Sequence, residues 1–363
     1  MHITILCKVV DNFGDIGVCY RLARRLRFLE PEITVSLVVS SLDSFAKINN
    51  RIDSRKSFQI AEGIEVFDWN DADFCRKIFS EYDGARLSVI LECFQCGRPG
   101  WMEEILFEQT LGRTVNIIMI DYLTAERYAD DFHCLKSLTR SARVQKVNFM
   151  PGFTSRTGGL IIDSGWETVR AWNAHGAALF FMYESDWLPL AQALCDCGRP
   201  VLVAQGNGRD SFLDACSACG MQSAEVLGFL NQDEWDEMMR SCGVLFVRGE
   251  DSLARACLSG IPFVWQAYPQ SEDYQIVKVE ALLFAMRPFF LEDDFDFIRR
   301  LWLDFNQPVS ERDDLNFRNA CAEFLSSLGK FEGGFRAFAS SLRKNGDLGL
   351  NLMTFIRKNG ILR

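Results

Sequence analysis

The stretch from residue 244 to residue 270 constrains the fold more than any other part of the sequence. It reads VLFVRGEDSLARACLSGIPFVWQAYPQ. The apolar run 244–247 predicts a buried strand, Gly249 permits a tight turn, and the apolar spacing that follows predicts a short helix ending at Gly260. Residues 262–265 then predict a second strand. The order of strand, helix and strand indicates a parallel sheet covered by helices.

The turn between that strand and that helix is a predicted phosphate site. Open α/β sheets bind ligands at the carboxyl ends of their strands, where the free amides of the next helix favour an anion such as a diphosphate. Ser252 and those amides would meet the anion, whereas Glu250 would be directed to hydroxyl or cationic groups. An alternative stays open, in which Asp251 or Ser252 only caps the helix.

A second unit of the same kind opens the sequence. Residues 3–9 predict a strand, the glycine-containing turn VDNFGDIG follows at 10–17, and residues 18–26 predict a helix. The turn does not match the G-x-G-x-x-G pattern of dinucleotide sites, so we expect Asp11 and Asp15 to serve chemistry and not phosphate binding. Each aspartate taken alone is also compatible with a helix cap.

The alternation of strands and helices continues along the chain. Further strands of the first half are predicted at 33–39, 64–67, 87–91 and 115–120. The turns after the last two should lie at the same sheet edge as Asp11 and Asp15. Strands of the second half are predicted at 177–183, 200–204 and 224–229, with helices at 187–195, 232–241, 313–338 and 348–356.

Two Rossmann-like α/β domains would use this length well, because 363 residues exceed the size at which one core usually stops growing. Residues 150–159 contain one proline and three glycines and predict the passage between the domains. We therefore expect a first domain at 1–152 and a second at 160–346. A final helix at 347–363 is expected to complete the first domain.

The composition limits the class of function. Apolar residues make up 48 % of the chain, charged residues 24 %, and no apolar run approaches the ~20 residues that span a bilayer. The net charge of -10 disfavours a nucleic-acid partner and favours a basic one. The first residues resemble a strand more than an export signal, so we expect a cytoplasmic protein without membrane association.

Thirteen cysteines are scattered through the predicted elements, and we expect reduced and mostly buried thiols. Two pairs, Cys93/Cys96 and Cys216/Cys219, have the C-x-x-C spacing of zinc sites. The chain has three histidines and the pairs lie far apart in sequence, so no metal site is predicted.

Several longer motifs identify a family. They are VDNFGDIGVCYRLARRL at 10–26, PGFTSRTGGL at 151–160, FFMYE at 180–184, LGFLNQDEWD at 227–236, FVRGEDSLARA at 246–256 and PFVWQAYPQ at 262–270. Together these motifs closely resemble the elongation factor P arginine rhamnosyltransferases, the EarP family. The resemblance spans nearly the whole chain.

This resemblance implies a GT-B glycosyltransferase fold and an inverting enzyme. Such an enzyme transfers L-rhamnose from dTDP-β-L-rhamnose to the guanidinium of one arginine on the folded N-terminal domain of translation elongation factor P. The modified factor then rescues ribosomes stalled at polyproline. The resemblance implies no metal or other cofactor.

The resemblance also implies site residues. The carboxylates of the reaction fall on Asp11, Asp15 and Glu250, and we assign the role of base to Asp15 because a carboxylate can orient a guanidinium and accept its proton. The implied donor-binding residues are Asn12, Phe13, Gly14, Phe181, Tyr183, Phe229, Gln232, Glu250, Asp251, Ser252, Tyr268 and Gln270.

Two departures and several alternatives accompany these assignments. Gln266 stands where the family commonly has a histidine, and AQGNGR at 204–209 replaces a pattern that is more often proline-glutamate-glycine. Phe181 and Phe229 are also compatible with an ordinary hydrophobic core. The alternative functions are a GT-B enzyme acting on a small molecule and a sugar-nucleotide-binding docking protein without catalysis. A pure binder does not need the aspartate pair of the first turn.

Overall fold

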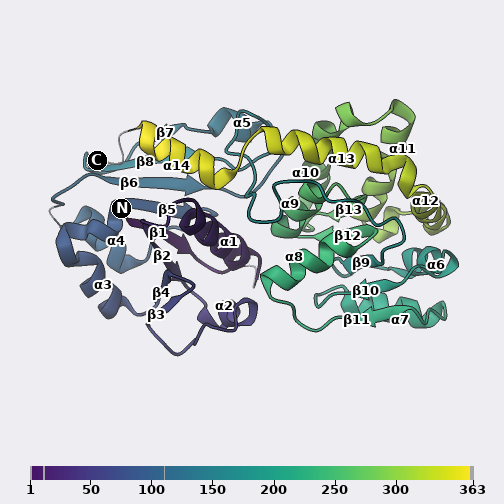
Figure 1. Cartoon of the computed structure of the whole chain (residues 1–363), viewed down its shortest axis with the longest axis horizontal. Helices are drawn as coiled ribbons and strands as arrows, with labels where there is room; N and C mark the ends of the chain where they lie inside the picture. Colours follow the sequence, from purple (N-terminus) through teal and green to yellow (C-terminus); the bar gives the residue numbers. More distant parts are fainter. Residues whose placement is uncertain (1, 11–12, 110, 360–363) are drawn as a thin grey trace. The chain divides into compact units, whose positions relative to one another are not determined.

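The computed structural model describes residues 2–10, 13–109 and 111–359. Contacts divide the chain into two compact units, which Figure 1 shows coloured along the sequence. Unit 1 comprises Met1–Ser164 together with Lys344–Arg363, and unit 2 comprises Gly165–Arg343. The segment 150–159, which the sequence suggests as the passage between domains, lies inside unit 1.

The described part of unit 1 contains one eight-stranded sheet with the order β3-β4-β2-β1-β5-β6-β8-β7. All neighbouring strands are parallel except the two outermost pairs, β3 with β4 and β7 with β8. The strands are β1 His2–Cys7, β2 Thr34–Val39, β3 Phe58–Ala61, β4 Ile64–Asp68, β5 Val89–Cys93, β6 Val115–Ile120, β7 Lys136–Ser137 and β8 Val144–Phe149.

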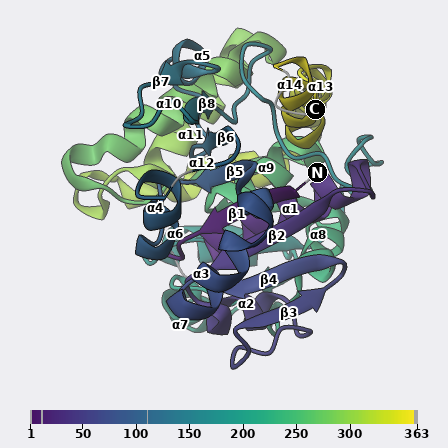
Figure 2. The same cartoon turned by 90° about the vertical axis from the view of Figure 1, so that its left-hand side faces the viewer.

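Helices cover both faces of this sheet (Figure 2). They are α1 Gly14–Leu29, α2 Leu42–Ile48, α3 Ala72–Ser80, η1 Glu81–Leu87, α4 Gly100–Phe107, α5 Tyr128–Phe132 and α14 Leu348–Lys358. Successive residues of β1 point to opposite faces, so Ile5 belongs to the core beneath α1, α2 and α14 whereas Leu6 belongs to the core beneath α3 and α4. Helix α1 begins at Gly14, four residues earlier than the sequence suggests, and this places Asp15 in its first turn.

Unit 2 contains a parallel sheet of five strands in its described part, with the order β11-β10-β9-β12-β13. The strands are β9 Ala178–Phe181, β10 Val201–Val203, β11 Ala224–Val226, β12 Val244–Arg248 and β13 Phe263–Gln266. The helical segments are α6 Leu188–Asp196, α7 Arg209–Ala218, α8 Gln232–Ser241, α9 Glu250–Ser259, η2 Ser271–Asp273, α10 Tyr274–Met286, η3 Arg287–Phe289, α11 Glu292–Asn306, η4 Val309–Glu311, α12 Asp314–Ser326 and α13 Leu328–Lys344. The single helix predicted at 313–338 is therefore two helices.

Asp347 attaches the last helix to unit 1. Its side chain accepts a hydrogen bond from Leu350 N at 2.7 Å and so caps α14. The same carboxylate accepts from Ile162 N at 2.6 Å and from Arg25 Nε at 3.2 Å. One buried aspartate thus joins α14, the segment before residue 164 and α1.

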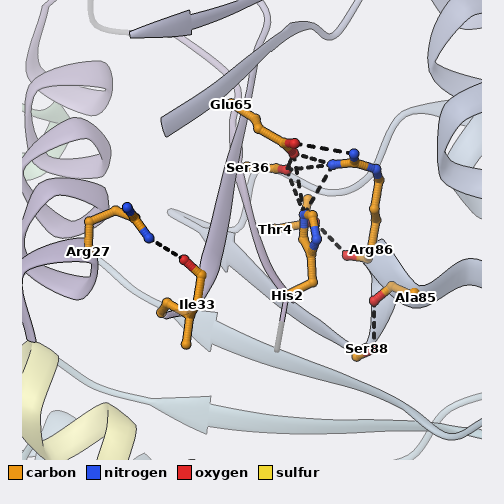
Figure 3. Close-up of polar contacts among 9 residues, drawn as sticks. All are labelled: His2, Thr4, Arg27, Ile33, Ser36, Glu65, Ala85, Arg86 and Ser88. Atoms are coloured by element: carbon orange, nitrogen blue, oxygen red, sulfur yellow. Dashed lines mark hydrogen bonds and ion pairs between the residues drawn. The ribbon is translucent and has the colours of Figure 1, made fainter. Parts of the chain in front are cut away.

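A polar network joins residues in the first halves of strands β1, β2 and β4 of the unit 1 sheet to Arg86 (Figure 3). The Glu65 carboxylate of β4 pairs with the Arg86 guanidinium and accepts from the Ser36 hydroxyl of β2 at 2.7 Å. His2 Nε2 lies 2.7 Å from the same hydroxyl, and Thr4 Oγ1 donates to the Arg86 carbonyl at 2.6 Å. Burial and the Arg86 charge lower the pKa of His2 from 6.5 to about 4, so this imidazole is neutral at pH 7.

No helix among the described residues is both long enough and apolar enough to cross a bilayer.

Candidate functional site

The junction of β12 and α9 shows the local structure that its sequence predicts. Strand β12 is buried between β9 and β13, and the chain turns at Gly249, whose φ of 71° is in the region that favours glycine. Gly249 is the N-cap of α9, so the alternative in which Asp251 or Ser252 is the N-cap is wrong. The amides of this first turn open at the carboxyl end of the sheet, which is the usual anion position.

The side chains of this junction carry opposite charges. Glu250 and Asp251 are half-buried in the first turn of α9, and Ser252 is buried. Two carboxylates alone would repel a diphosphate, so an anion site here requires a compensating cation. Arg248, the last residue of β12, is the cationic residue nearest to them in the sequence.

The Arg248 guanidinium lies against two aromatic rings. Its Cζ is 4.6 Å from the ring centre of Phe181 and 4.5 Å from that of Tyr183, both on or just after β9. Its Nε is buried and has no hydrogen-bond partner among the described residues. A Cβ added at Gly206 would come within 3.3 Å of Arg248 Nη2 and 3.1 Å of Phe181, so glycine lets the loop after β10 approach this group.

Gln266 fixes the backbone of this cluster. Its Oε1 accepts a hydrogen bond from Tyr183 N at 2.7 Å, although β9 and β13 are separated in the sheet by β12. The Tyr183 ring meets the Tyr268 ring edge-on at 5.4 Å, and Tyr268 is otherwise exposed. Gln266 therefore has a defined structural role. Gln270 N donates to Gln275 Oε1 at 3.1 Å in the loop that follows.

Phe229 and Gln232 lie after β11 on the same edge of the unit 2 sheet. Phe229 is 48 % exposed, so the alternative of an ordinary core residue is wrong for it. Gln232 is buried and begins α8, whose N-cap is Asn231. Phe181 packs against Trp235 of α8 at 5.0 Å, which connects this turn to the Arg248 cluster.

Asp15 fixes the first turn of unit 1. It is buried, with 4 % of its surface exposed, and its Oδ2 accepts a hydrogen bond from Val10 N at 2.8 Å. Phe13 is the N-cap of α1, so Asp15 is not a cap. Gly14 is exposed, and Lys47 Nζ lies 5.6 Å from the Phe13 ring centre. The predicted residues Asp11 and Asn12 lie outside the described residues.

The loops after β5 and β6 lie on the same sheet edge as Asp15, as predicted, because β5 neighbours β1 and β6 neighbours β5. Phe94 and Gln95 both have positive φ, at 57° and 51°, which is an uncommon conformation for residues other than glycine. Gln95 Nε2 donates to Asp121 Oδ2 at 3.0 Å, and the Phe94 ring stacks on Tyr122 at 4.7 Å. These contacts join the two loops.

All thirteen cysteines are free thiols. Burial raises the pKa of Cys96 strongly and that of Cys216 to about 12, which keeps these members of the two C-x-x-C pairs protonated. Within the described ranges, no group of three or more His, Cys, Asp or Glu side chains is placed to hold a metal ion.

Sequence reasoning missed Arg248 and the function of Gln266. The signal for Arg248 is local, because an arginine ends a buried strand directly before the predicted phosphate turn. Gln266 carries no comparable signal. Its partner Tyr183 is distant in sequence, and the contact depends on the order of the strands.

Comparison with known proteins relates this geometry to a family. A family profile described as elongation factor P (EF-P) rhamnosyltransferase EarP matches residues 3–357. A protein-arginine rhamnosyltransferase of Shewanella oneidensis is 31% identical over 324 residues, which cover 78% of this chain and 80% of the relative. One of Pseudomonas aeruginosa is 31% identical over 335 residues, which cover 83% of this chain and 86% of the relative.

Solved structures share the fold. One, from work on EarP-mediated arginine glycosylation of translation elongation factor EF-P, gives a TM-score of 0.58 at 20% identity and covers 99% of both chains. A kitacinnamycin glycotransferase gives 0.55 at 14% identity, covering 98% of both chains. At such identities the likeness establishes the fold alone, which is the GT-B glycosyltransferase fold. The profile match over nearly the whole length establishes more: this chain belongs to the EarP family of elongation factor P rhamnosyltransferases.

Proposed function

We propose that this protein is an inverting glycosyltransferase that moves L-rhamnose from dTDP-β-L-rhamnose to an arginine guanidinium of translation elongation factor P. The modified factor would rescue ribosomes stalled at polyproline. Family membership supports this proposal, and one structural observation carries it. Arg248 lies against Phe181 and Tyr183, directly before the amino end of α9.

The donor would bind at the carboxyl edge of the unit 2 sheet. Its diphosphate would be held by Arg248, by the first-turn amides of α9 and by the Ser252 hydroxyl, because charge-assisted hydrogen bonds are the strong ones. Glu250 would bind sugar hydroxyls, and the exposed Phe229 ring offers a face to the base. Arg248 would also supply the positive charge that a diphosphate requires beside Glu250 and Asp251.

The acceptor would bind at the carboxyl edge of the unit 1 sheet. A free guanidinium has a pKa above ~12 and is protonated at neutral pH, so one proton must leave as its nitrogen bonds to the anomeric carbon. The Asp15 carboxylate would accept that proton. The bond to Val10 N fixes the orientation of this carboxylate, and Asp11 would be the second carboxylate facing the cation.

The leaving group completes the reaction. As the new carbon–nitrogen bond forms, the bond from the anomeric carbon to the diphosphate oxygen breaks and dTDP departs with the negative charge. Arg248 and the α9 amides would stabilise that charge, so we expect the reaction to need no metal ion. Transfer that persists after treatment with a chelator would support this expectation, and loss restored by Mg²⁺ would contradict it.

The central test is intact-mass analysis of elongation factor P after incubation with this protein and dTDP-β-L-rhamnose. The expected product is heavier by one deoxyhexosyl group, and fragmentation should place that group on an arginine. An unchanged mass with this donor, together with transfer to a small molecule, would favour the alternative GT-B enzyme. Nucleotide binding without transfer to any acceptor would favour the non-catalytic alternative.

A further inference from the structure

A run of exposed apolar side chains extends from the loop after β6 to the residue that follows strand β7. Tyr122 is 38%, Tyr128 36%, Phe132 46%, Leu135 49% and Leu138 102% exposed. Large apolar side chains concentrated in one short segment mark an interaction site more often than an ordinary surface. We call these five side chains the 122–138 surface.

The 122–138 surface has a fixed support behind it. Asp130 of α5 pairs with Arg156 at 2.5 Å and accepts from the Thr154 hydroxyl. His133 Nδ1 accepts from Met150 N at 3.1 Å, and its ring packs on Phe149 at 4.7 Å. These contacts hold one side of the segment against the rest of unit 1.

The apolar side chains of the 122–138 surface remain exposed to solvent. Tyr128 and Phe132 are one helical turn apart on α5, and their rings meet edge-on at 6.1 Å. Strand β7 follows as the last strand of the sheet, beside β8 (Figure 2). A surface that is ordered before binding loses little conformational freedom when a partner covers it.

The surface is continuous with the predicted acceptor edge. It begins at Tyr122, which stacks on Phe94, and the neighbouring Asp121 accepts from Gln95. The loop that carries Phe94 and Gln95 follows β5, and Cys96 Sγ of the same loop lies 3.6 Å from the Leu6 carbonyl oxygen of β1. Strand β1 leads into the turn of Asp15. Along the chain, the exposed apolar residues therefore run from the loop that contacts Phe94 and Gln95 to Leu138, directly after the last strand of the sheet.

We infer that the 122–138 surface docks the folded acceptor protein, which is elongation factor P under the function proposed above. Guanidinium groups are common on proteins, so a carboxylate such as Asp15 cannot select one arginine by itself. Selection requires contacts with the fold around that arginine, and these must lie near the acceptor edge. The 122–138 surface is the concentration of exposed apolar side chains that adjoins this edge in the described part of unit 1.

The inference rests on the proposed function, and a pair of double variants tests it. Phe132→Ser/Leu138→Ser removes two of the five side chains of the 122–138 surface. Phe28→Ser/Ile60→Ser is the matched control, since it removes one phenylalanine and one aliphatic residue that are 64% and 67% exposed on α1 and β3. Neither pair includes a residue assigned to donor binding or catalysis.

The first double variant is expected to raise KM for elongation factor P by about tenfold or more, as truncation of apolar anchor side chains does at protein interfaces. Its kcat and its KM for dTDP-β-L-rhamnose should stay at the wild-type values, and the control should match wild type throughout. Equal acceptor KM values in both double variants would overturn the docking inference.

Hydrogen exchange separates failure of this inference from failure of the function. Protection of residues 122–138 on addition of elongation factor P would support docking, even if the wild type transferred no sugar and the proposed function failed. Transfer by the wild type without protection of this segment would overturn docking and leave the function standing. Protection that instead rises with the concentration of this chain alone would show that a second copy covers the surface, which also overturns the inference.

Discussion

The Gln266 side chain accepts a hydrogen bond from the backbone N–H of Tyr183 at 2.7 Å. This bond connects the carboxyl ends of β9 and β13, which are not neighbours in the sheet. Strand β12 lies between them and carries Arg248 at its end. Gln266 thus sets the position of the Tyr183 backbone, and the Tyr183 ring contacts the Arg248 guanidinium. Both residues are buried, so the bond is shielded from water.

Replacing Gln266 by leucine should raise KM for the sugar nucleotide about tenfold. The substitution keeps the size of the side chain but leaves the Tyr183 N–H buried without its acceptor, which costs about 1–3 kcal/mol. Gln266→His should restore most of the affinity, because a neutral imidazole nitrogen can accept the same bond. Steady-state kinetics with varied donor would measure both. Equal donor KM in the leucine variant and wild type would show that Tyr183 does not depend on this bond.

Replacing Arg248 by glutamine should weaken binding of dTDP about 10- to 100-fold, as expected for a lost charge-assisted contact to phosphate worth about 1.5–3 kcal/mol. Calorimetric titration with dTDP measures the affinity directly. Arg240→Gln is the matched control, because Arg240 precedes the amino end of β12 and also lies over an aromatic ring, that of Trp166, at 4.9 Å. If both variants bind dTDP equally, the diphosphate site is not at Arg248.

Replacing Asp15 by asparagine should lower kcat at least 100-fold while donor affinity stays within a few-fold of wild type. The amide oxygen of asparagine can still accept the Val10 N–H, so the turn is kept while the proton acceptor is lost. Single-turnover transfer to elongation factor P would measure the chemical step. Residual activity above about a tenth of wild type would remove Asp15 from the role of base.

The His2 network should make unit 1 less stable in acid. The pKa of His2 is about 4 in the fold and 6.5 ordinarily, so between these values the unfolded chain binds this proton more tightly and the free energy of unfolding falls as the pH decreases. The full effect is roughly 3 kcal/mol. The pKa of Glu65 is also lowered, by its hydrogen bonds to Arg86 and Ser36 against the effect of burial, and contributes in the same direction below its ordinary value.

Urea denaturation at pH 7, 5.5 and 4.5 would measure this dependence, with His2→Gln as the comparison. Glutamine keeps a polar group beside Ser36 but does not titrate, so the decrease between pH 7 and pH 4.5 should be smaller in the variant. Parallel pH profiles for the two proteins would mean that His2 does not contribute.

The sequence predicts the central strands well because their burial produces continuous apolar runs, as in β5, β6 and β12. Three strands of unit 1 escape prediction for physical reasons. Strand β7 has two exposed residues, and β8 mixes its buried positions with Gln145, Lys146 and Asn148. Strand β3 is a short edge strand in which Phe58 and Ile60 are exposed. In each of the three, any alternation of apolar and polar residues covers too few positions to predict a strand.

The candidate site residues at the carboxyl edges of the two sheets are predictable where a single turn of the sequence contains them. The turn between β12 and α9 is such a case, and so is the placement of Asp15 beside the loops after β5 and β6. Contacts between distant segments are not predictable in this way. The position of Arg248 against Phe181 and Tyr183 depends on which strand neighbours β12, and local sequence does not specify that neighbour.

The attachment of α14 has a consequence for the order in which the protein is made. Unit 2 is continuous in sequence, and all of it emerges from the ribosome before α14 does. Unit 1 begins first but must wait for Leu352, Met353 and Ile356, which belong to its core beside α1. Unit 1, whose translation begins first, is therefore the unit that finishes folding last. A chain terminated just before Asp347 would lack part of the unit 1 core but would contain the whole sequence of unit 2.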